Sequence, residues 1–127
     1  MARDIYHQIN RTMDKSVKQY RQIIIDILND YHHTPSIGIY GEELEEQLII
    51  DTKQDHYQIL TIGWENGKRV YYPVFHIDIK NNKIWVQEDA TDFDLVGKLE
   101  EKGVKNTDIV LAFQSPVKRP YSGYAVA

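Results

Sequence analysis

The sequence predicts a single α+β domain, in which a long N-terminal helix packs on a mainly antiparallel sheet of about five strands. Helical periodicity occurs in two segments, a long one near the N-terminus and a short one before the last strand. Four β-rich segments joined by short turns lie between them. Strands that follow each other through short turns pair antiparallel. Helices that flank a run of strands are typical of a helix-on-sheet layer fold.

The long helix is predicted to run from Asp14 to His33. Its apolar residues recur at three- and four-residue steps, which places them on one face: Val17, Tyr20, Ile24, Ile27, Leu28 and Tyr31. Pro35 follows and disfavours helix in the residue before it. Residues 1–12 carry little pattern, and we expect them to be frayed or partly helical.

Four strands are predicted at 47–51, 57–64, 69–79 and 83–87. Asn66-Gly67 is a strong hairpin signal, because both residues tolerate positive φ. Pro73 lies inside the third strand, and since proline has no N–H for the ladder it marks a bulge or a locally unpaired edge. Asp92 is expected to cap a short helix over 93–102. A fifth strand at 109–113 and an extended tail follow.

Length, charge and the lack of cysteine exclude several classes of protein. A chain of 127 residues can bury a core without disulfides or a structural metal. The absence of cysteine excludes thiol catalysis and thiolate zinc sites. No apolar run approaches the roughly 20 residues that span a bilayer, and we expect a cytoplasmic protein. A chain with a net charge of −4 lacks the overall attraction to phosphate that drives DNA binding. Any DNA contact should therefore be indirect or weak.

The third strand carries the candidate chemistry. His76, Asp78 and Lys80 alternate along it and so share one face. With Asp55 as a further ligand, His76 and Asp78 could bind a divalent metal and activate water, and Lys80 could stabilise charge. Asp78-Ile79-Lys80 also matches the short acidic-x-Lys part of a nuclease motif. The other interpretation is that these residues form the solvated face of a hairpin.

The tail joins two cations, Lys118 and Arg119, to two aromatic residues, Tyr121 and Tyr124. Such a mixture can contact nucleic acid through phosphates and stacking, for which Lys118 and Arg119 are the candidates. It can equally anchor a protein interface, where Tyr and Arg are favoured. A third interpretation is that the tail folds back on its own sheet, with both tyrosines filling gaps.

An ordered series of segments resembles the XisI family of cyanobacterial proteins, from about residue 13 to the end. The segments are 14–31 (DKSVKQYRQIIIDILNDY), 51–64 (DTKQDHYQILTIGW), 69–71 (RVY), 76–80 (HIDIK), 83–87 (KIWVQ) and 108–127 (DIVLAFQSPVKRPYSGYAVA). The resemblance implies one XisI-like domain over 1–127, with 13–127 matching the family and 1–12 as an N-terminal extension.

The resemblance also implies a function. Family members are expected to control excision of the fdxN DNA element, which is removed during heterocyst differentiation in filamentous cyanobacteria. A separate recombinase cuts the DNA, and the XisI-type protein acts with a XisH-type partner. No catalytic residues are established for the family. We therefore expect a non-enzymatic, partner-binding factor without a cofactor, and a homo-oligomer is a further candidate assembly.

The expected partner-binding residues are Tyr71, Arg119, Tyr121 and Tyr124. Tyrosine and arginine are enriched at the energetically important positions of interfaces. The alternative function is a metal-dependent hydrolase or nuclease that uses the Asp/His cluster on the sheet.

Overall fold

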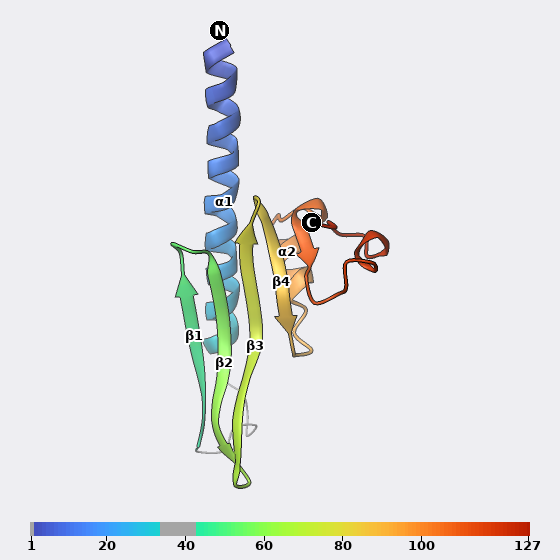
Figure 1. Ribbon diagram of the computed structural model, residues 1–127. Coiled ribbons are helices and arrows are strands. Elements are labelled where there is room, and N and C mark those ends of the chain that lie inside the picture. Colours follow the sequence, from blue (N-terminus) through green and yellow to red (C-terminus); the bar gives the residue numbers. More distant parts are fainter. Residues whose placement is uncertain (1, 34–42) are drawn as a thin grey trace.

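The computed structural model describes the backbone of residues 2–33 and 43–127, and the side chains of 16–33 and 43–127. Figure 1 colours the chain from its N- to its C-terminus. The main elements are α1 (Ala2–His33), β1 (Leu44–Asp51), β2 (His56–Glu65), β3 (Lys68–Lys80), β4 (Lys83–Asp89), α2 (Leu95–Glu101) and β5 (Ile109–Leu111). Neither helix within these described ranges is long and apolar enough to cross a membrane.

The five strands form one sheet in the order β1-β2-β3-β4-β5. The first three neighbouring pairs are antiparallel, since short turns join them. β4 and β5 pair in parallel, because the connection through α2 is long enough to carry the chain back across the sheet. The expected α+β fold, a long helix on a mainly antiparallel sheet with a short helix before the last strand, is confirmed.

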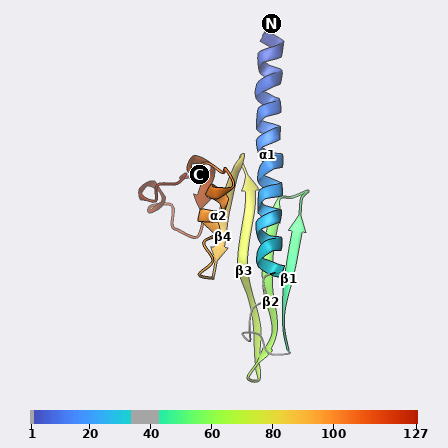
Figure 2. The same cartoon turned by 180° about the vertical axis from the view of Figure 1, so that it is seen from behind.

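The core lies between α1 and one face of the sheet. Tyr20, Ile24 and Leu28 of α1 are buried, as their helical spacing predicts. Tyr31 packs edge-on against Phe75, with 4.7 Å between the ring centroids. The fully buried hydrophobic residues of β2, β3 and β4 on this face are Tyr57, Ile59, Phe75, Ile77, Ile84 and Val86. Figures 1 and 2 show α1 along the same face from opposite sides.

The other face of β1, β2 and β3 is named the open face. Burial alternates along β2, where Tyr57 and Ile59 are buried against α1 while Gln58 and Leu60 between them are more exposed. Within the described part of the chain, no helix covers the open face (Figures 1 and 2). Side chains on it are therefore available to solvent and to other molecules.

A one-residue bulge interrupts the pairing of β2 with β3. Leu60 is opposite Pro73, whereas the preceding residue of β2, Ile59, is opposite Phe75, so Val74 has no partner on β2. Pro73 lies beyond the segment of β3 that pairs with β4, which ends at Phe75. The bulge expected at the proline is therefore present. Between the bulge and the start of β2, each residue of β2 is therefore paired one residue further along β3 than it would be without the bulge.

Three local details differ from the sequence expectation. Residues 2–12 belong to α1. Asp94, and not Asp92, caps α2, because Asp94 Oδ1 accepts a hydrogen bond from the N–H of Gly97 at 3.0 Å. The tail is not extended throughout, since it contains a 3₁₀ turn, η2 (Arg119–Tyr121), and then returns to β5. The helix end predicted at His33 is confirmed, since α1 ends at that residue.

Candidate functional site

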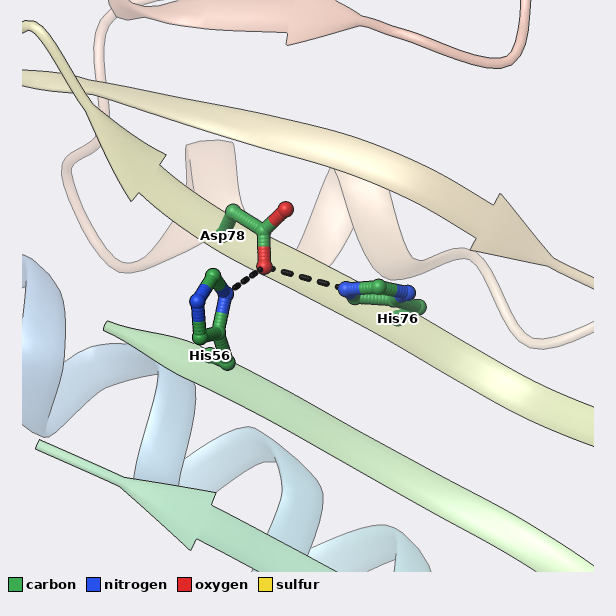
Figure 3. Close-up of side chains that lie close together, drawn as sticks. All are labelled: His56, His76 and Asp78. Carbon is green, nitrogen blue, oxygen red and sulfur yellow. Dashed lines mark hydrogen bonds and ion pairs between the residues drawn. The ribbon is translucent and has the colours of Figure 1, made fainter. Parts of the chain in front are cut away.

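Two histidines and one aspartate meet on the open face (Figure 3). His56 Nδ1 lies 2.7 Å from Asp78 Oδ1, and His76 Nε2 lies 3.0 Å from the same oxygen. His56 begins β2 and is directly opposite Asp78 of β3. His76 precedes Asp78 by two residues and so points to the same side of the strand. These three residues are named the His–Asp cluster.

A fourth residue positions the carboxylate of the cluster. Gln87 of β4 donates from Nε2 to Asp78 Oδ2 at 3.2 Å. Both carboxylate oxygens are therefore occupied, one by Gln87 and the other by the two imidazoles. The side chain of Asp78 is 17% exposed, whereas that of His56 is 52% exposed. The carboxylate thus forms the floor of the cluster, and His56 forms its solvent-facing rim.

The electrostatics of the cluster favour positive charge on the rim. The hydrogen bond from His56 to Asp78 raises the pKa of the imidazole above its ordinary value, and desolvation of His56 opposes this effect. More distant carboxylates at Asp51 and Asp55 act in the same direction as Asp78. A cation at the position of the imidazole protons is therefore stabilised by nearby negative charge.

Asp55, which the sequence suggested as a ligand, lies apart from the cluster. Arg21 binds its two carboxylate oxygens, at 2.7 and 3.0 Å, and Tyr57 donates its hydroxyl to one of them at 2.7 Å. The guanidinium lowers the pKa of Asp55, although partial burial opposes it. Asp55 therefore serves as an ion-pair partner of α1, and His56 takes its place beside His76 and Asp78.

Asp55 and His56 are neighbours at the start of β2, and the sequence alone does not say which of them is opposite Asp78. One residue of slip moves every side chain to the other face of a strand. The bulge beside Pro73 places His56 opposite Asp78. The pairing of His56 with Asp78 can be found by counting residue pairs away from the Asn66-Gly67 turn. One extra residue of β3 must be allowed next to Pro73.

Lys80 does not join the cluster as a charge-stabilising group. Its ammonium lies 4.2 Å from the centroid of the Trp85 ring, a distance typical of a cation–π contact. Trp85 in turn donates from Nε1 to the carbonyl of Lys80 at 3.0 Å. The two residues thus hold each other at the β3–β4 turn.

The expected partner-binding residues divide into exposed and packed ones. Tyr71 is 66% exposed and Tyr121 is 89% exposed. Tyr124 packs against the core, and its hydrogen bond to Glu100 raises its pKa to about 12. Arg119 is half-buried and donates to the carbonyls of two residues that precede it. The tail is therefore partly folded back on its own domain, and Lys118 stays exposed.

An apolar surface occupies the open face beyond the His–Asp cluster. Ile62 of β2 is opposite Tyr71 of β3, and Leu60 is opposite Pro73. Trp64, at the end of β2, is 50% exposed. The surface, named the open-face patch, consists of Ile49, Leu60, Ile62, Trp64, Tyr71 and Pro73.

Comparisons with known proteins place these features in a family. The family model described as XisI protein matches residues 13–126. A XisI-like protein from Anabaena variabilis ATCC 29413 has a crystal structure that is 39% identical in sequence, with a TM-score of 0.79, over 87% of this chain and 99% of that one. The fdxN element excision controlling factor XisI from the same strain is 34% identical, with a TM-score of 0.77, over 88% of this chain and 99% of that one.

No curated protein matched the chain. The family model nevertheless covers most of the sequence, and both crystal structures share the fold of this chain at more than 30% identity. The chain belongs to the XisI family.

Proposed function

We propose that this chain is a non-enzymatic controlling factor in the excision of a DNA element, and that it acts by binding a XisH-type protein. Membership of the XisI family supports the controlling role, since one relative of known structure is an fdxN element excision controlling factor. In this proposal another protein cuts the DNA, and the present chain supplies a binding surface. The setting is heterocyst differentiation in filamentous cyanobacteria.

The observation that carries the proposal is the open-face patch. It gathers aliphatic and aromatic side chains from three adjacent strands, and Trp64 and Tyr71 are at least half exposed. Tryptophan and tyrosine dominate the binding energy of many protein interfaces. A contiguous exposed apolar surface marks an interaction site more often than scattered apolar residues do. The patch therefore supports contact with another folded protein.

The border of the patch supports the same interpretation. The guanidinium of Arg69 lies 5.8 Å from the centroid of the Trp64 ring, and Glu45 is opposite Ile62 on the neighbouring strand. An apolar centre with a charged border is the usual arrangement of a protein–protein interface. Direct contact with DNA has less support, because the guanidinium of Arg119 donates to backbone carbonyls of its own chain.

Co-expression with a XisH-type protein tests the proposal. We expect the two chains to copurify, and we expect Tyr71→Ala and Trp64→Ala each to weaken the complex at least about tenfold, as loss of a central aromatic residue does. Tyr72→Ala is the matched control, since it removes an exposed tyrosine of the same strand that is opposite Thr61 and so lies on the other face of β3. Each variant is first compared with the parent chain by its melting temperature.

Of two informative results, the first would overturn the proposal and the second would overturn the role of the open-face patch in it. One is the absence of a complex between the parent chain and the XisH-type protein at micromolar concentrations. The other is a homodimer that Tyr71→Ala dissociates while binding of the XisH-type protein is unchanged. That result would assign the open-face patch to self-association and would require a different surface for the partner.

A further inference from the structure

We propose that the His–Asp cluster binds one divalent transition-metal ion of the zinc class. His56 Nδ1, His76 Nε2 and Asp78 Oδ1 are the three ligand atoms. The inference concerns a different part of the open face from the patch and does not depend on the identity of the partner. It stands on the convergence of three side chains from two strands.

The geometry of the cluster is close to that of a metal site. The three ligand atoms all lie within 4.8 Å of one another. Nitrogen and oxygen ligands lie about 2.0–2.2 Å from zinc, so that two ligands of a tetrahedral site are ~3.3 Å apart. The distances of 2.7 and 3.0 Å from the imidazoles to Asp78 Oδ1 need to widen by about 0.6 and 0.3 Å to reach that separation. Since His56 is half exposed, it has room for that movement.

The chemistry of the ligands selects the class of ion. Two imidazoles with one carboxylate suit zinc, copper, iron or nickel, whereas magnesium and calcium prefer oxygen ligands alone. Three protein ligands leave at least one coordination position for water or for a donor atom of another molecule. The exposed rim at His56 places that position on the solvent side of the sheet.

Neighbouring residues fix the orientation of the candidate metal ligands. Gln87 donates to Asp78 Oδ2, which leaves Oδ1 directed at the imidazoles. Such contacts from a residue next to a ligand fix its orientation, and their loss typically lowers metal affinity 10- to 100-fold. His56 and Asp78 are held opposite each other by the β2–β3 ladder. Ligands on strands are positioned more accurately than ligands on loops.

Titration of the tag-free chain with Zn²⁺ and Co²⁺ tests the proposal. We expect calorimetry to give one ion per chain and Zn²⁺ to raise the melting temperature. We also expect bound Co²⁺ to absorb visible light strongly, as four- or five-coordinate Co²⁺ does and six-coordinate Co²⁺ does not. Asp78→Asn and His76→Gln should each weaken binding at least about 100-fold. Gln87→Met should weaken it about 10- to 100-fold.

His32→Gln is the matched control, because His32 also pairs with a carboxylate, that of Glu46 at 2.9 Å, but away from the cluster. It should leave binding unchanged. His56→Gln provides a second ligand variant if Asp78→Asn melts at a lower temperature than the parent chain without metal. Failure of the parent chain to bind either ion, or binding that persists in both Asp78→Asn and His76→Gln, would overturn the metal site.

The same samples separate this proposal from the proposed function. Hydrolysis of a phosphodiester by the Zn²⁺-loaded chain, lost in Asp78→Asn, would support the metal site and overturn the non-enzymatic role. Loss of the XisH-type complex in Tyr71→Ala, with metal binding unchanged, would support both proposals as independent properties of the open face.

Discussion

Arg21 of α1 binds both carboxylate oxygens of Asp55, which lies just before β2. The distances are 2.7 Å from Nε to Oδ1 and 3.0 Å from Nη2 to Oδ2. Asp55 itself has a positive φ of 60°, a conformation that is uncommon outside glycine and costs free energy. The ion pair therefore connects the helix to the sheet and holds the β1–β2 turn in this conformation.

Arg21→Met should destabilise the fold, because it leaves the mostly buried carboxylate of Asp55 with Tyr57 as its remaining side-chain donor. We expect the free energy of unfolding to fall by about 1.5–3 kcal/mol, the range for hydrogen bonds to charged groups. Urea denaturation measures the loss. Lys18→Met, at an exposed position one turn earlier, is the control and should change stability by less than about 0.5 kcal/mol. Equal losses in the two variants would contradict the role of Arg21.

Thr61 offers a test of a buried polar group. Its side chain is fully buried on the face of β2 that packs under α1, and its hydroxyl has no hydrogen-bond partner among the described residues. Replacing an unsatisfied buried hydroxyl by a methyl group of the same shape removes a desolvation cost. Thr61→Val should therefore leave stability unchanged or raise it, by up to about 2 kcal/mol, in urea denaturation.

The control for this prediction keeps the hydroxyl and removes the methyl group. Thr61→Ser should lose about 1 kcal/mol, since a buried methyl group is removed and the polar group stays unsatisfied. A loss of more than 1 kcal/mol in Thr61→Val would mean that the hydroxyl does have a favourable partner.

The helix and the strands could be predicted from the sequence because their signals are local. The three- and four-residue spacing of Tyr20, Ile24 and Leu28 places them on one face whatever the rest of the chain does. The parallel pairing of β5 has no such signal. It depends on how α2 packs against the rest of the domain. The buried residues Leu95 and Leu99 make this packing contact, and they can do so only after the sheet has formed.

The candidate site illustrates the same limit at the level of single residues. Continuing the register set by Glu65 and Lys68 without a bulge would place Asp55 opposite Asp78. The unpaired Val74 moves His56 into that place. The sequence could predict that Pro73 disturbs the ladder, but not which residue becomes the extra one, since cross-strand packing decides it. His76 and Asp78 were predictable as neighbours because they lie on one strand.

Stability should fall at alkaline pH because of buried tyrosines such as Tyr20. Burial and a hydrogen bond to Asp108, whose Oδ2 lies 2.5 Å from the hydroxyl, raise the pKa of Tyr20 to about 12, whereas an unfolded tyrosine has a pKa of about 10. Between these values the unfolded chain loses a proton that the folded chain keeps. The stabilisation is therefore complete below pH ~10 and is lost as pH rises towards 12.

Tyr20→Phe should make this loss of stability less steep, by up to about 1.4 kcal/mol per pH unit, the value for one proton. Burial and the bond to Asp55 also raise the pKa of Tyr57, so part of the slope should remain. Chemical denaturation at a series of alkaline pH values measures it. Tyr121→Phe is the matched control, because that side chain is exposed. An identical slope in Tyr20→Phe and the parent chain would contradict the assignment.

The tail should detach from the sheet when Arg119 is replaced. The guanidinium donates to the carbonyls of Ala112 and Gln114, at 3.2 and 3.1 Å, and lies 5.7 Å from the centroid of the Trp85 ring. These contacts join η2 to the end of β5 and shield the indole. Arg119→Gln removes the charge and should cost roughly 1–2 kcal/mol, with more exposure of Trp85 to solvent.

Acrylamide quenching of tryptophan fluorescence in a Trp64→Phe background measures that exposure, since Trp85 is then the remaining tryptophan. Quenching should increase in Arg119→Gln and stay at the parent level in Lys118→Gln, which removes a charge from the exposed neighbouring residue. If both variants quench like the parent chain, the contacts of Arg119 do not hold the tail.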